Sequence, residues 1–290
     1  MFDFSTPPEM AALSGADIAY RCSGSGPALL CLHGYPQTMY MWHRIADRLA
    51  QHFTVILADL RGYGDSSAPA TDAQHSPYSK RAMAADMAEL MAHLGHDSYA
   101  VIGHDRGGRV AHRMARDHAD HITKLTVLDI APTSQMYDAT DMEFARAYYH
   151  WFFLIQPAPL PETLIEGAAE SFLIHKLGHW GKTQDAHTPQ AVAEYKRCFC
   201  RPQTIHASCE DYRAAAGIDL NHDAEDRHIP LSMPVQVLWG ADGFVGHKFD
   251  PVAEWRKQAP SVQGHAVPGG HFLPEEAPEE TLNAVLAFLA

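Results

Sequence analysis

The chain has 290 residues, of which 46% are hydrophobic and 20% charged, which suits one large globular domain or a domain with an insert. Its formal net charge of −13 argues against nucleic acid or an anionic membrane as a partner, because both carry negative charge. No apolar segment follows a basic start, and no run of about 18 apolar residues occurs, so neither secretion nor a membrane span is expected.

The cysteines and histidines do not form a recognisable metal motif. Five scattered cysteines make an odd set without zinc-type spacing, and twenty histidines include no H-E-x-x-H. We therefore expect reduced thiols, a cytoplasmic protein, and neither a metal nor a cofactor.

Apolar runs alternate with helical patterns along the first part of the chain. A leader and an edge hairpin, with strand residues 18–22, come first. Four continuously apolar runs are typical of strands buried on both faces: residues 28–32, 53–58, 99–102 and 125–128. Helices are predicted over residues 42–51 and 79–94, and Gly95 ends the second of them.

The pattern changes after residue 132. Residues 133–230 contain helical and proline-rich stretches but no convincing strand, and strand patterns resume at 235–239 and 264–267 before a closing helix at 278–290. The sequence therefore predicts an α/β fold with a mostly parallel central sheet flanked by helices. We expect a core domain of residues 1–132 and 231–290, and an inserted helical cap of residues 133–230.

The turn after residues 99–102 is Gly103-His-Asp-Arg-Gly-Gly108, and a helical pattern follows it. It matches the G-x-S-x-G nucleophile elbow, with Asp105 in place of the serine. An aspartate, whose reference pKa is about 3.9, is already ionised at neutral pH and can displace a leaving group from a saturated carbon. The resulting ester needs water activated by a histidine, so the elbow predicts cleavage of a carbon–halogen or epoxide bond.

Polar residues follow the predicted strands at the edge where α/β sheets bind ligands. His271, behind two glycines after the last strand, is the candidate general base. Two acids could orient it, Asp129 after the strand that follows the elbow and Asp242 after strand 235–239.

Six motifs resemble those of the fluoroacetate (haloacetate) dehalogenases, which have the α/β-hydrolase fold, and the resemblance extends over essentially the whole chain. The motifs lie at residues 33–37, 103–109, 150–157, 211–215, 239–246 and 269–272. Those at 103–109 and 150–157 are the most specific. The resemblance implies that Asp105 attacks the α-carbon of a 2-haloacid, that His271 activates water, and that Asp129 rather than Asp242 is the acid.

Arg106 and Arg109 have the i, i+3 spacing that places two side chains on one helix face. A substrate carboxylate about 4 Å from Asp105 would be repelled by roughly 4 kcal/mol at an effective dielectric of 20. One charge-assisted hydrogen bond returns about 1.5–3 kcal/mol, so two arginines are needed to hold an anion there. The resemblance also implies a clamp on the substrate carboxylate.

The resemblance implies further site residues. His150, Trp151 and Tyr212 would donate hydrogen bonds to the leaving halide, and Trp180 would line the pocket. The backbone N–H groups of Tyr35 and Arg106 would form an oxyanion hole. The family further suggests a homodimer that acts on a small haloacid without a cofactor.

Two other functions stay open. An epoxide hydrolase would use the same Asp105 and two tyrosines of the cap, for which the candidates are Tyr148, Tyr149, Tyr195 and Tyr212. The arginine pair argues against that activity, unless the epoxide is acidic. A ligand-binding protein without activity would use the same scaffold. The sequence does not indicate which halide is favoured.

Overall fold

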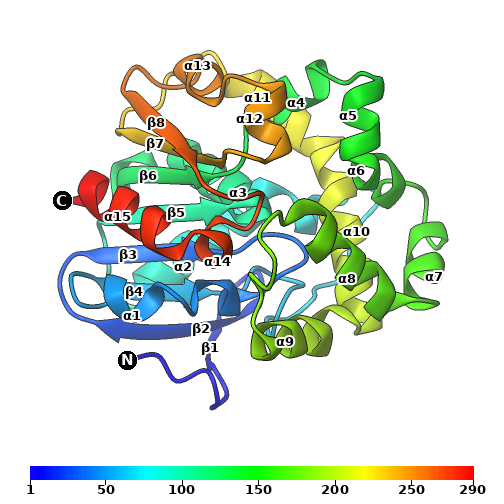
Figure 1. The fold of residues 1–290 in the computed structure, drawn as a ribbon, viewed down its shortest axis with the longest axis horizontal. Helices are drawn as coiled ribbons and strands as arrows, with labels where there is room; N and C mark the ends of the chain where they lie inside the picture. The colour runs from blue at the N-terminus through cyan, green and yellow to red at the C-terminus, as the bar shows by residue number, and fades with distance from the viewer.

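The computed structural model describes residues 1–290 and has an eight-stranded sheet at its centre (Figure 1). The strand order is β1-β2-β4-β3-β5-β6-β7-β8, and only β2 runs against the others. The strands are β1 (Glu9–Ala12), β2 (Asp17–Gly24), β3 (Ala28–Leu32), β4 (Thr54–Ala58), β5 (Tyr99–His104), β6 (Ile122–Leu128), β7 (Val235–Gly240) and β8 (Val262–Val267).

The register of the parallel strands brings their carboxyl ends to one edge. Leu32 of β3 pairs with Ala58 of β4 and Gly103 of β5, and Leu128 of β6 pairs with His104 and with Leu238 of β7. The residues that follow these strands therefore lie along the same edge, as the sequence predicts for a site of this fold class.

Helices cover both faces of the sheet (Figure 1). One face carries α2 (Lys80–His93), α3 (Asp105–Asp117) and α13 (Pro251–Arg256), and the other carries α1 (Ala46–Leu49), α14 (Leu273–Glu276) and α15 (Pro278–Leu289). A short α12 (Phe244–Lys248) follows β7. This is the predicted α/β architecture, in which apolar strands are buried between two helical layers.

Between β6 and β7 the chain forms helices without a strand, and these helices lie over the carboxyl ends of the strands (Figure 1). They are α4 (Thr133–Asp138), α5 (Met142–Ala147), α6 (Tyr149–Leu154), α7 (Leu160–Glu166), α8 (Ala169–Trp180), α9 (Pro189–Phe199), α10 (Pro202–Ala215) and α11 (Ile218–Asp226).

Two local expectations were wrong. The helix expected over residues 42–51 is instead a 3₁₀ turn, η1 (Met39–Trp42), followed by the four-residue α1. Consecutive buried side chains at Met41 and Trp42 suit the tighter turn better than a continuous α-helix, which buries one stripe. Strand β1 was not expected, because only Ala11 of its four residues is buried and no alternation results.

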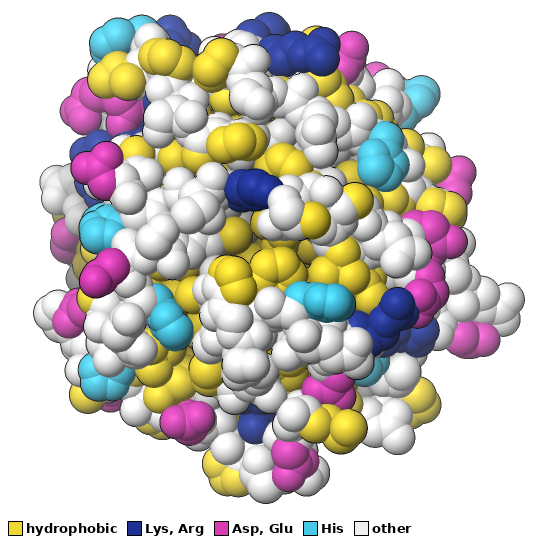
Figure 2. Space-filling model, turned by 90° about the vertical axis from the view of Figure 1, so that its left-hand side faces the viewer, with side chains coloured by type: hydrophobic (Ala, Val, Ile, Leu, Met, Phe, Trp, Pro, Cys, Tyr) yellow, Lys and Arg dark blue, Asp and Glu magenta, His cyan; other side chains and the backbone are white.

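The surface opposite the helices of residues 133–230 carries interspersed acidic, basic and histidine side chains (Figure 2). A single-sign field, such as a nucleic-acid-binding face would need, is not seen on this side. None of the helices combines the length and the apolarity needed to cross a bilayer.

Candidate active site

The predicted elbow forms a sharp turn between β5 and α3. Asp105 is the first residue of α3 and has a φ of 45°, a conformation in which non-glycine residues are strained. A Cβ added to Gly103 would lie 2.6 Å from the Cα of Gly108, and one added to Gly107 would lie 2.6 Å from the carbonyl oxygen of Leu32. The turn therefore requires glycine at both positions.

Asp105 is buried and held as a carboxylate. The backbone N–H of Tyr35 donates to its Oδ2 at 3.0 Å. Burial raises the pKa of Asp105, but the charges of His271, His104 and the two neighbouring arginines outweigh burial, so the pKa lies below its ordinary value. An ionised, buried carboxylate on a strained turn can act as a nucleophile without a base.

His271 is oriented by Asp129. Its Nδ1–H donates to Asp129 Oδ2 at 2.6 Å, and Asp129 Oδ1 accepts from the backbone N–H of Gly240 at 3.1 Å. Asp242 is exposed and makes no hydrogen bond to His271. Burial lowers the pKa of His271, but the hydrogen bond and charge of Asp129 outweigh burial and raise it. With Nδ1 protonated, Nε2 is free to accept a proton from water.

The two arginines of the expected clamp differ in their hydrogen-bond partners. Arg106 donates from Nε to Asp211 Oδ2 at 2.9 Å and from Nη2 to Asp211 Oδ1 at 2.6 Å, so most of its fork is occupied. Only its Nη1 has no partner. The Arg106 guanidinium also lies over the Tyr212 ring, 4.1 Å from the centroid.

Arg109 has no carboxylate partner. Its Nη1 donates to Thr133 Oγ1 at 2.8 Å, its Nε has no partner, and its guanidinium lies 4.8 Å from the centroid of the Trp151 ring. Both arginines are buried. A buried guanidinium without a counter-ion is costly, so this side of the site is arranged for an anion.

A buried ionic cluster lies behind Arg106. Asp211 also pairs with Lys80, whose ammonium lies 3.7 Å from Asp219, and accepts from the Tyr63 hydroxyl at 2.7 Å. Together with Arg109, these groups leave one positive charge in surplus beside Asp105. The sequence reasoning missed Lys80 and the role of Asp211, because no spacing rule links residues so far apart in the chain.

Three buried donors with no partner converge next to the arginines. His150 and Trp151 come from α6 and Tyr212 from α10, and the atoms His150 Nδ1, Trp151 Nε1 and Tyr212 Oη make no hydrogen bond. The ring centroids of His150 and Tyr212 are 5.4 Å apart, and those of Trp151 and Tyr212 are 6.4 Å apart. Each unsatisfied buried donor costs about 1–3 kcal/mol, which indicates a ligand at this point.

Trp180 links the base to these donors. Its ring centroid lies 5.4 Å from that of His271 and 4.5 Å from that of His150, and its Nε1 also has no partner. A cavity of about 300 Å³ lies beside Trp180 and His271. Asp129, Tyr148, Trp180, Asp242 and His271 are among the residues that line it.

A larger cavity, of about 600 Å³, lies away from this site, between the N-terminal segment and α9. Two of its acidic groups pair with one arginine: Arg197 bonds Asp65 at 2.6 Å and Glu194 at 2.7 Å. None of the residues described around Asp105 lines this cavity, so it is separate from the candidate site.

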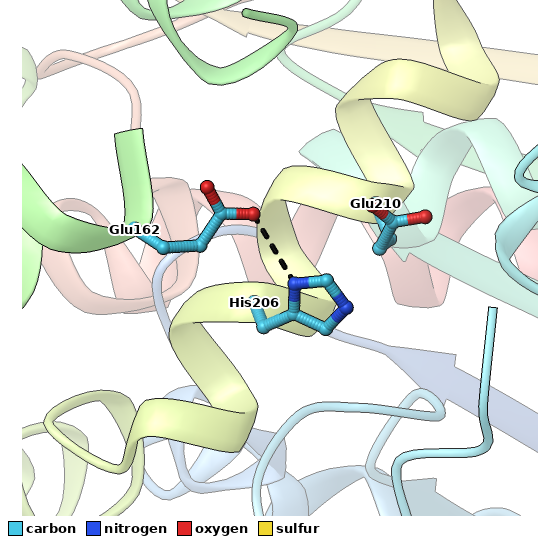
Figure 3. Close-up of side chains that lie close together, drawn as sticks. All are labelled: Glu162, His206 and Glu210. Carbon is cyan, nitrogen blue, oxygen red and sulfur yellow. Dashed lines mark hydrogen bonds and ion pairs between the residues drawn. The ribbon is translucent and has the colours of Figure 1, made fainter. Parts of the chain in front are cut away.

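Glu162, His206 and Glu210 form a group with the composition of a metal site (Figure 3). However, Arg213 Nη1 donates to one oxygen of each glutamate at 2.7 Å. A guanidinium already fills the position of a cation, so the group is better explained as an ion-pair cluster that holds α7 against α10.

The comparisons with known proteins agree with the fold. The family model of the alpha/beta hydrolase fold matches residues 27–278. A fluoroacetate dehalogenase from Burkholderia sp is 43% identical over 94% of this chain and 91% of its own length. A soluble epoxide hydrolase from Corynebacterium sp. (strain C12) is 35% identical over 97% of this chain and 96% of its own length.

A solved structure of an alpha/beta hydrolase from Nostoc sp PCC 7120 has a TM-score of 0.97 and 56% identity, and the alignment covers 98% of this chain and 97% of that chain. Both fold and sequence thus agree over nearly the full length of these relatives. The chain belongs to the α/β-hydrolase family, and within that family it is similar to a fluoroacetate dehalogenase.

Proposed function

We propose that this hydrolase removes the halogen from haloacetates such as fluoroacetate and chloroacetate, releasing glycolate and halide. The observation that carries the proposal is the set of three buried donors without partners beside Arg109, a buried cation without a counter-ion. An anionic substrate with an anionic leaving group satisfies both features. The 43% identity to a fluoroacetate dehalogenase supports it.

In the first step, a carboxylate oxygen of Asp105 attacks the α-carbon while the carbon–halogen bond breaks. Arg109 and the free Nη1 of Arg106 hold the substrate carboxylate and fix the α-carbon in line. The halide leaves with the bonding electron pair toward the N–H and O–H groups of His150, Trp151 and Tyr212. The product is a glycolyl ester of Asp105.

In the second step, His271 Nε2 takes a proton from water, and the oxygen attacks the carboxyl carbon of Asp105. The negative charge on the tetrahedral intermediate is stabilised by the backbone N–H groups of Tyr35 and Arg106. The ester bond then breaks as His271 gives its proton to the leaving glycolate oxygen, and the Asp105 carboxylate is restored when its carboxyl group loses a proton to solvent. The net reaction consumes one water and releases one proton.

The helices of residues 133–230 act in this proposal as a cap that supplies the halide donors and excludes water. The core would then be residues 1–132 and 231–290. We further propose a homodimer, which sedimentation would test, and a cytoplasmic location, which the five free cysteines support.

The test is halide release from fluoroacetate and chloroacetate by the wild type and by Asp105→Asn. We expect halide and glycolate in equal amounts from the wild type and none from the variant. Chloride without fluoride would keep the mechanism and exclude defluorination. Halide release that persists in Asp105→Asn, or none from the wild type, would contradict the proposal.

Epoxide hydrolysis is the second candidate, because an epoxide hydrolase is 35% identical. Two of the tyrosines fit it: Tyr212 has an unpartnered hydroxyl, and Tyr148 lines the cavity beside His271. Tyr195 does not, because its hydroxyl donates to Glu275 at 3.0 Å. Turnover of a neutral epoxide without halide release from haloacetates would favour this function.

A further inference from the structure

Lys176 is a buried cation that the mechanism above does not use. Its side chain, on α8, has no exposed surface, and its Nζ has neither a hydrogen bond nor an ion pair. The ammonium lies instead among aromatic rings, 3.7 Å from the centroid of Tyr149, 4.9 Å from Trp180 and 5.3 Å from Phe172. Ring faces attract a cation but do not neutralise it.

The three aromatic rings around Lys176 hold its ammonium behind the side chains that would donate to the halide in the halide pocket, which are those of His150, Trp151 and Tyr212. Trp180 contacts both Lys176 and His150, and Tyr149 precedes His150 in α6. Lys176 is also the charged group with the largest effect on His150, whose pKa lies well below its ordinary value because of burial first and of Lys176 second. The imidazole is therefore neutral and acts as a hydrogen-bond donor through a single N–H.

The charges of the reaction require such a cation. The cluster around Arg106 and Arg109 has one positive charge in surplus, whereas the site holds two negative charges throughout the first step. These charges are Asp105 and the substrate carboxylate before attack, and the carboxylate and the halide after it. One negative charge thus moves from Asp105 to the halide pocket, while Arg106 is already paired with Asp211 and, in the proposed mechanism, Arg109 holds the substrate carboxylate.

We propose that Lys176 is a positioning residue whose ammonium serves as counter-charge for a halide bound by His150, Trp151 and Tyr212, acting across the His150 and Trp180 rings. The role of Lys176 in turnover rests on the proposed function, whereas its effect on halide binding can be measured without turnover. Because the ammonium can lose its charge, the proposal also predicts that the affinity for halide depends on pH.

Burial lowers the pKa of Lys176 to about 7, so the counter-charge is present below pH 7 and is lost as pH rises above it. The titratable groups that face it are neutral near this pH. Burial raises the pKa of Tyr149, and burial lowers the pKa values of His150 and His179. No carboxylate lies within ion-pair distance of the ammonium to hold its charge at higher pH.

The binding test is a bromide titration followed by quenching of tryptophan fluorescence, at pH 6 and at pH 9. For Lys176→Met we expect the Kd at pH 6 to rise about tenfold, the order expected for unit charges roughly 10 Å apart in a protein interior. At pH 9, where Lys176 is neutral, wild type and variant converge. His271 titrates equally in both proteins, so the ratio of their Kd values isolates Lys176.

Two further variants complete the binding test. Lys196→Met is the matched control, because Lys196 forms an exposed pair with Glu170, and its Kd should equal that of the wild type. Lys176→Arg keeps a permanent charge, and its Kd at pH 9 should be tighter than that of the wild type. Equal Kd values for wild type and Lys176→Met at pH 6 would overturn the inference. If Lys176→Met does not fold, a Lys176→Arg Kd at pH 9 no tighter than the wild-type value would do so.

The turnover test separates this inference from the proposed function. Lys176→Met should lower kcat/KM by about tenfold for fluoroacetate and less for chloroacetate, because fluoride is the poorer leaving group and needs more stabilisation. Equal losses for both substrates would contradict the turnover role. If the wild type releases no halide at all, the proposed function fails, while the bromide titration still decides the role of Lys176.

Discussion

Asp105 and His271 have opposite shifts of pKa, which assigns them different tasks. The pKa of Asp105 is lowered and that of His271 is raised, so the first is ionised at neutral pH and the second holds a proton more tightly than a free imidazole does. The histidine is not needed to activate Asp105. In the proposed mechanism it is needed only when water attacks the ester.

Replacement of the base should therefore separate the two steps. His271→Asn should release about one equivalent of halide per site and then stop, because the ester forms but is not hydrolysed. Mass spectrometry of the variant after exposure to chloroacetate should find a glycolyl group on the peptide containing Asp105. Continued turnover at the wild-type rate would exclude His271 as the base.

The acidic limb of the pH profile should follow His271. Its neutral form is the active one, so kcat should fall as pH decreases through a pKa that is raised above the ordinary value of 6.5. Asp129→Asn removes the cause of that raise, so the limb should move to lower pH while kcat falls at all pH values. A limb that stays in place in Asp129→Asn would assign it to another group.

The two arginines should respond differently to removal. Arg109→Leu removes a cation without a counter-ion, so kcat/KM for a haloacetate should fall by about ten- to a hundredfold, with a small loss of stability. Arg106→Leu also strips Asp211 of its bidentate partner and should cost roughly 3 kcal/mol of folding free energy. Thermal melts and kinetics of both variants test this; equal stability losses would contradict it.

At the scale of residues, the sequence is informative where a motif joins neighbours in the chain. Asp105 follows from the elbow, and its backbone strain follows from the glycines around it. The pairing of Arg106 with Asp211 joins residues 105 positions apart and could not be derived from local spacing. The unpaired state of Lys176 likewise depends on which rings surround it.

At the scale of elements, the continuously buried strands were the most predictable, and the exposed β1 was missed. All five residues of β3 are buried, which gives a continuous apolar run, whereas β1 buries one residue of four. Helix α2 was predictable at both ends, because Ser79 caps it by accepting from the N–H of Ala82 and Gly95 adopts a φ of 81° after it.

The elbow glycines should not tolerate a side chain. Gly107→Ala places a methyl group 2.6 Å from the carbonyl oxygen of Leu32 and should cost more than about 2 kcal/mol, with loss of activity. Gly178→Ala, in α8, meets nothing within 4 Å and should be neutral or stabilise by up to about 1 kcal/mol. Denaturant unfolding compares them, and similar free energies for the two variants would contradict the elbow geometry.

At the scale of the whole molecule, the chain has a formal net charge of −13, although the proposed substrate is an anion. The arginines proposed to hold the substrate carboxylate are buried, so we expect little long-range attraction from them, and the outer field should repel an anion. The proposed function therefore predicts that an anionic substrate is bound by local desolvated contacts rather than by steering.

Ionic strength should reveal this arrangement. With sulfate as the added salt, kcat/KM for chloroacetate should rise modestly between about 0.01 and 0.15 M ionic strength, because the outer repulsion is screened while the buried contacts are not. The neutral analogue chloroacetamide, measured in parallel, should show no change if it reacts. A steep fall for chloroacetate would mean that exposed cations steer it.

The attack of Asp105 on the substrate carbon is the central claim, and a single turnover in ¹⁸O-labelled water tests it most directly. With enzyme in excess over chloroacetate, the hydroxyl oxygen of glycolate should come unlabelled from Asp105, and the label should appear in the peptide that contains Asp105. Label in the glycolate hydroxyl and none in the peptide would mean that water attacks the substrate directly, and the ester mechanism would be wrong.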